Sequence, residues 1–86
     1  MTRTFLNVKT WFIEREQEKA TKYNLFIDIE NRDENGFINH ENEFQKVIAE
    51  VISESEKAIQ VILNTGSVVG SAKGWKTWIP KSVIKN

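Results

Sequence analysis

The stretch "GWKTWIPKSVI", residues 74–84, carries the clearest secondary-structure signal in the chain. Aromatic and β-branched side chains between Trp75 and Ile79 predict a strand, whose side chains point alternately to its two faces. We expect Trp75, Thr77 and Ile79 to face inward, and Lys76 and Trp78 to face outward. Pro80 ends the strand because it has no N–H to donate to a sheet. The next residues, "KSVI", predict a single helical turn followed by a short extended piece.

A second apolar stretch precedes this one. Ala58–Leu63 is almost continuously apolar, which predicts a strand that is buried on both faces. Residues 64–74 contain three of the four glycines and therefore predict a flexible hairpin loop between the two strands. The expected core of this hairpin is Ile59, Val61, Trp75 and Ile79.

Two patterns overlap between residues 41 and 53. The residues with helical spacing are Phe44, Val47, Ile48, Val51 and Ile52, whereas Val47, Ala49 and Val51 alternate as in a strand. β-Branched residues lower the helix propensity of this segment. We predict a short helix over Asn42–Lys46 and a strand over Val47–Ser53, and a helix over residues 41–52 stays open.

The N-terminal third also leaves an alternative open. The composition of Thr4–Ile13 favours a strand, and the competing prediction is a helix that is capped by Asn7. The next segment, "EREQEKATKY", predicts a solvated helix or a charged loop, because it has almost no apolar stripe. In "NLFIDIE", residues 24–30, apolar residues alternate, which predicts a further strand.

Together these elements predict one domain over residues 1–86, of the α+β class. We expect a small β-rich fold, either a partly open barrel or a twisted antiparallel sheet, with one or two short helices. The chain has no cysteine, no apolar run that could span a membrane and no signal-peptide pattern, so we expect a cytoplasmic protein without disulfides. The tail is similar to the end of Src-homology-three-like barrels, a likeness of architecture that implies no function.

Residues 54–84 contain "ESEKAIQVIL", a glycine-containing loop and "WKTWIPKSVI", which form the pattern E-K-A, an apolar strand, a loop, and W-x-P-K-S with an apolar residue after it. With this pattern the chain resembles a group of small proteins from phages and mobile elements of Gram-positive bacteria, in which an N-terminal "WF" (here Trp11–Phe12) also recurs. The resemblance implies a mobile-element setting and a small, mostly β fold. It implies no particular activity.

Charges are separated along the chain although they sum to zero. Residues 14–56 hold all twelve acidic residues against five bases, whereas residues 57–86 hold five lysines and no acid. This separation predicts a dipolar surface that could steer a charged partner. The alternative is that folding brings the two blocks together, so that their charges alternate in space.

Metal and catalytic motifs are weak. Residues 31–43 contain "NRDENGFINHEN", which has several features of an EF-hand calcium loop, but Asn42 stands where the closing bidentate glutamate should be. His40 is the single histidine, and the chain has no cysteine, so a zinc site is not expected. We predict no cofactor, no metal site and no enzymatic activity.

The sequence therefore predicts a non-enzymatic binding module, an accessory protein of a phage or mobile element. Its expected partner is a protein, with host defence complexes and a second copy of the chain among the candidates. The alternative is a small barrel that binds single-stranded nucleic acid, and a calcium-responsive domain ranks last. The residues expected to contact the partner are Lys73, Lys76, Trp78, Lys81 and Lys85.

Overall fold

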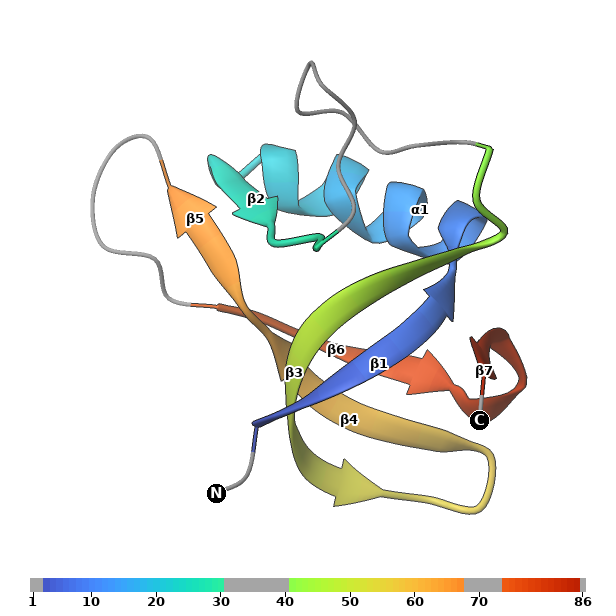
Figure 1. Ribbon diagram of the computed structural model, residues 1–86. Helices are drawn as coiled ribbons and strands as arrows, with labels where there is room; N and C mark the ends of the chain where they lie inside the picture. The colour runs from blue at the N-terminus through green and yellow to red at the C-terminus, as the bar shows by residue number, and fades with distance from the viewer. Residues whose placement is uncertain (1–2, 31–40, 68–73, 86) are drawn as a thin grey trace.

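The computed structural model describes residues 3–30, 41–67 and 74–85. In chain order its elements are β1 (Arg3–Lys9), α1 (Thr10–Thr21), β2 (Leu25–Ile27), β3 (Phe44–Glu54), β4 (Ala58–Leu63), β5 (Thr65–Ser67), β6 (Trp75–Pro80), the 3-10 turn η1 (Lys81–Val83) and β7 (Ile84–Lys85). The fold is therefore α+β and rich in strands, as predicted (Figure 1). The strand over residues 75–79, its end at Pro80, the single turn and the last extended piece are all confirmed.

Five strands form one antiparallel sheet in the order β6-β4-β3-β1-β7, and β2 and β5 form a separate two-stranded sheet. The turn η1 carries the chain from β6, at one edge of the larger sheet, to β7, at the other edge, where β7 pairs with β1. Figure 1 shows that β3 curves strongly as it crosses the sheet. Among the described strands β6 and β7 do not pair with each other, so the sheet curls without closing into a barrel.

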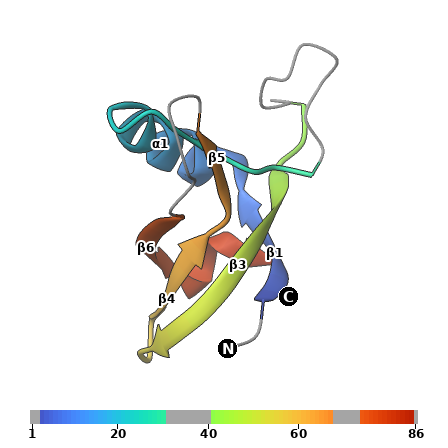
Figure 2. The same ribbon diagram turned by 90° about the vertical axis from the view of Figure 1, so that its left-hand side faces the viewer.

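The core lies between the inner face of this sheet and α1. Ile59, Val61 and Leu63 on β4 are buried, as is Ile79 on β6, and Trp75 packs against them while partly exposed. The predicted core of the hairpin is thus confirmed. The prediction that β4 is buried on both faces is wrong, because its residues alternate between buried and half-buried. In both views α1 lies at one end of the sheet (Figures 1 and 2).

The predicted strand over residues 4–13 is wrong at its C-terminal end. The strand stops at Lys9, and α1 begins at Thr10. The backbone N–H of Thr10 donates to the carbonyl of Glu43 at 2.9 Å, which ties the start of the helix to the start of β3. Phe12, Ile13, Glu16 and Ala20 are buried on one face of the helix. The segment predicted to be a solvated helix or loop is therefore a helix with one face in the core.

The predicted helix over Asn42–Lys46 is also wrong. Phe44–Lys46 belongs to β3 and pairs with residues 7–9 of β1. Because β1 lies alongside, cross-strand hydrogen bonds and packing outweigh the local helical spacing. The strand predicted over Val47–Ser53 is confirmed within the longer β3.

The loop predicted over residues 64–74 and the strand predicted over residues 24–30 have different outcomes. The predicted hairpin loop over residues 64–74 is wrong where Thr65–Ser67 forms β5 and pairs with β2, and residues 68–73 lie outside the described residues. The strand predicted in residues 24–30 is confirmed as β2, with Ile29 forming an isolated bridge to Val47.

Candidate functional site

The outer face of the five-stranded sheet is formed by the side chains that alternate with the core residues. In antiparallel strands, residues directly opposite each other share a face, so the register shows which side chains are neighbours. One row across the face runs through Arg3, Glu50, Ile62 and Lys76. In the row beside it, Phe5 lies opposite Ile48, and the backbone N–H of Asn64 donates to the carbonyl of Ile48 at 2.9 Å.

Lys76 and Trp78 lie on this outer face, as predicted. Both are exposed on β6, which pairs only with β4 among the described strands. Trp78 is 46% exposed, lies opposite Gln60, and is two residues beyond Lys76, which lies opposite Ile62. An exposed tryptophan on a strand at a sheet edge is a feature typical of protein-interaction surfaces.

Two other predicted contact residues, Lys81 and Lys85, lie away from this pair. Lys81 Nζ lies 2.7 Å from Glu54 Oε2, in an ion pair at the β3–β4 end of the sheet. Lys85 lies on β7, at the opposite edge from β6, with its Nζ 5.6 Å from the centre of the Phe44 ring. Lys73 lies outside the described residues. Among the four of these five residues that the structure describes, Lys76 and Trp78 are close neighbours on one strand, and Lys81 and Lys85 lie elsewhere.

Charges that are far apart in the sequence come together in the fold. Lys81, from the basic tail, pairs with Glu54, and Lys9 Nζ lies 3.8 Å from Glu43 Oε1. Within the acidic block, Lys46 pairs with Glu30. One of these pairs, Lys81 with Glu54, joins the basic tail to the acidic block, so folding brings part of the two blocks together.

An apolar groove lies beside Phe5. Its lining combines the apolar residues Phe5, Ile29 and Ile48 with Asp28 and Glu30, and its volume is about 480 Å³. Phe5 is 54% exposed, and Lys46 Nζ lies 4.7 Å from the centre of its ring. The outer face therefore presents aromatic rings, ammonium groups and carboxylates together.

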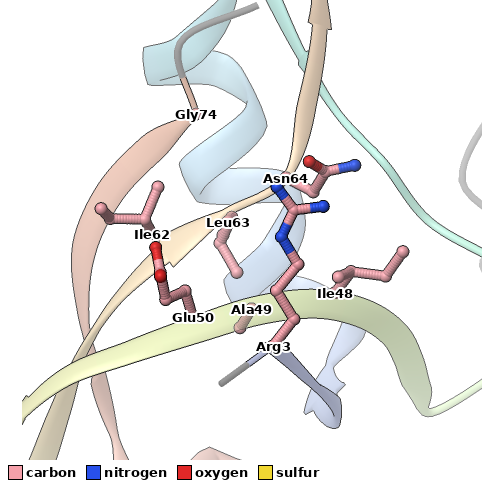
Figure 3. Close-up of a pocket in the computed structure, with 8 residues that line it drawn as sticks. All are labelled: Arg3, Ile48, Ala49, Glu50, Ile62, Leu63, Asn64 and Gly74. Carbon is pink, nitrogen blue, oxygen red and sulfur yellow. The ribbon is translucent and has the colours of Figure 1, made fainter. Parts of the chain in front are cut away.

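A second depression, which we call the hollow, adjoins this groove at Ile48. Its lining is Arg3, Ile48, Ala49, Glu50, Ile62, Leu63, Asn64 and Gly74, and its volume is about 230 Å³ (Figure 3). None of these residues belonged to the predicted site. The sequence could not have identified the hollow, because the pairing register brings together residues of β1, β3 and β4 with Asn64, which follows β4, and Gly74, which precedes β6.

Glu16 is the most deeply buried acidic residue among those described, with 3% of its surface exposed. Its carboxylate accepts hydrogen bonds from Trp75 Nε1 at 3.3 Å and from the Thr77 hydroxyl, and Lys19 Nζ lies 3.1 Å away. These contacts join α1 to β6. The cluster is internal to the fold, and its structural role is to fix the inner face of β6 against the helix.

Within residues 3–30, 41–67 and 74–85, no group of three or more acidic, histidine or cysteine side chains is placed to hold a metal ion. Positions 31–40 of the calcium-like loop, including His40, lie outside the described residues. No helix in the described part of the chain is long and apolar enough to cross a membrane. Comparison with protein-family models, curated protein sequences and solved structures finds no match to this chain.

Proposed function

We propose that the protein is a non-enzymatic binding module that uses the outer face of β6 to bind a protein partner. The observation that carries this proposal is the position of Trp78, which is exposed on an edge strand next to the exposed Lys76. Tryptophan is enriched among the residues that dominate binding energy, because a large ring loses much water-exposed surface when a partner covers it.

The free edge of β6 gives a partner a second means of attachment. In the described sheet only one side of β6 is paired, so its other side can form main-chain hydrogen bonds with an added strand. Lys76 and Pro80 limit uncontrolled pairing, since a charged side chain and a residue without N–H both disfavour edge-to-edge aggregation. A specific partner would accommodate Lys76 with an acidic group.

The mixed charge of the outer face favours a protein over a polyanion. Glu50 lies in the same row as Lys76, and Lys46 and Lys81 are already paired with carboxylates. These carboxylates weaken the attraction of the face for phosphates. The resemblance of Glu54–Ile84 to mobile-element proteins supports a more specific role. In this role the chain is an accessory protein that modulates a host or phage complex in the cytoplasm.

A pull-down from a Gram-positive host lysate tests the proposal, with each sample divided into nuclease-treated and untreated halves. We expect the wild-type chain to capture a protein in both halves. The Trp78→Ala variant should not capture this protein. Trp11→Ala is the matched control, because Trp11 is 52% exposed on α1 and lies outside the sheet. Retention by Trp78→Ala, or equal loss with both variants, would contradict the proposed surface.

Single-stranded nucleic acid is the second candidate, favoured by one specific observation. Phe5 and Phe44 each have a lysine ammonium over the ring, Lys46 at 4.7 Å and Lys85 at 5.6 Å from the centre. Such rings can stack bases while neighbouring lysines contact phosphates. Nuclease-sensitive capture in the same pull-down would support this candidate against the first.

A further inference from the structure

The hollow exists because two adjacent positions on the outer face hold no covering side chain. Asn64 Nδ2 donates to Asp28 Oδ2 at 2.6 Å, so its amide group is directed to the β2 side of the molecule. Gly74 has no side chain, and a Cβ at this position would lie 2.5 Å from Ile62 Cγ2. Between these positions the side chains of Ile48 and Ile62 are left half-covered and form the apolar part of a lining that also includes Arg3 and Glu50.

Two opposite charges border this apolar lining without pairing. Arg3 and Glu50 lie directly opposite each other in the register of β1 and β3. Neither takes part in an ion pair with another described residue. Figure 3 shows the reason: the Arg3 guanidinium extends toward Asn64, whereas the Glu50 carboxylate lies beside Ile62. The two groups diverge around the hollow.

We infer that the hollow binds a free α-amino acid with an aliphatic side chain. In this arrangement the guanidinium of Arg3 binds the α-carboxylate, for which its planar fork of N–H donors is suited. Glu50 accepts hydrogen bonds from the α-ammonium group, and the aliphatic side chain covers Ile48 and Ile62. A zwitterion matches both charges, whereas a simple anion would be repelled by Glu50 and a simple cation by Arg3.

The size of the hollow agrees with this class of ligand. Its volume of about 230 Å³ is suited to one amino acid, since sites for drug-sized ligands typically start at about 300 Å³. The side-chain amide of Asn64 already donates a hydrogen bond to Asp28 Oδ2. The inference does not depend on the proposed protein partner, because none of the residues involved is Lys76 or Trp78.

Binding can be measured on the whole chain by NMR titration at constant ionic strength with L-leucine as the probe. We expect saturable shifts in the millimolar range for the Gly74 amide and for the methyl groups of Ile48 and Ile62. N-acetyl-L-leucine lacks the ammonium group and L-leucinamide lacks the carboxylate. Each should bind more weakly, on the order of tenfold, because hydrogen bonds to charged groups contribute more than neutral ones.

Two variants test which residue contacts each charged group of the ligand. Arg3→Gln should remove the advantage of leucine over leucinamide, and Glu50→Gln should remove its advantage over N-acetyl-leucine. Both side chains lie on the solvent side of the sheet, and an unchanged amide spectrum elsewhere would show that the fold is kept. Trp78→Ala should leave leucine binding unchanged, which separates this site from the partner surface. Absence of shifts around Gly74, or equal affinity for leucine and its two analogues, would overturn the inference.

Discussion

Trp75 and Trp78 lie on opposite faces of β6, and their surroundings differ accordingly. Trp75 packs against the core, its ring centre lies 5.8 Å from that of Tyr23, and its Nε1 donates to Glu16. Trp78 faces outward. The burial of its side chain therefore makes Trp75 a structural residue, whereas Trp78 is available to a partner.

Replacing each tryptophan with alanine should separate these roles. We expect Trp75→Ala to lower the free energy of unfolding by about 2–4 kcal/mol, because it leaves a partly buried cavity and removes a partner of Glu16. Trp78→Ala should cost less than about 1 kcal/mol, as is usual for exposed positions. Urea denaturation followed by circular dichroism measures both. A stable Trp75→Ala beside an unfolded Trp78→Ala would show that the faces of β6 are inverted.

The carboxylate of Glu16 is the second residue-scale feature with a measurable consequence. Glu16→Ala leaves the Trp75 N–H and the Thr77 hydroxyl without their acceptor inside the fold. We expect a loss of about 2–4 kcal/mol in the free energy of unfolding, since unsatisfied buried donors are costly. Glu18→Ala is the matched control on the exposed side of α1 and should change the stability little. Equal stability of the two variants would mean that the Glu16 contacts do not stabilise the fold.

At the scale of elements, Gly74 determines how β6 begins. Its φ is 80°, a conformation that residues with a side chain rarely adopt, and its backbone N–H donates to Thr65 Oγ1 at 3.1 Å. Gly74→Ala should cost about 1–3 kcal/mol through backbone strain and the clash with Ile62. At Gly66 an added Cβ meets nothing within 4 Å, so Gly66→Ala is the control. Thermal unfolding should show a lower midpoint for Gly74→Ala than for Gly66→Ala, and the reverse order would contradict the described geometry.

The C-terminal elements could be predicted from the sequence because their signals are local. Alternation identifies β4 and β6, and Pro80 marks where β6 ends. The start of α1 carries no such local signal, since Lys9 is its N-cap residue and makes no side-chain cap. Contacts of Thr10 with residues 42, 43 and 45 fix the helix start instead, and these contacts require the complete fold.

The same distinction applies to the outer face. Alternation along β6 correctly predicts that Lys76 and Trp78 point outward, because the face of each side chain depends only on its position in that one strand. The pairing of Lys81 with Glu54 and the position of Lys85 at the opposite sheet edge depend on contacts across the fold. The hollow depends on the register of β1, β3 and β4, which one sequence does not reveal.

At the scale of the whole molecule, mixed charge predicts weak binding to nucleic acid. Ion pairs join Lys9, Lys46 and Lys81 to carboxylates, so a bound strand would meet repulsion along with attraction. We expect no detectable binding of single-stranded DNA or RNA at physiological salt, because each phosphate contact weakens as salt rises. Tryptophan fluorescence at low and physiological salt measures this. Micromolar binding that survives physiological salt would favour the nucleic-acid candidate.

Site-specific photo-cross-linking tests the central claim, that Trp78 lies at the surface that contacts a protein partner. A photoreactive phenylalanine analogue replaces Trp78 in one variant and Trp11 in the control, and each is irradiated in nuclease-treated host lysate. We expect one dominant cross-linked protein from position 78 and none from position 11. A second copy of the chain as the captured protein would make the partner surface a homodimer interface. Equal cross-linking from both positions, or none from position 78, would contradict the account.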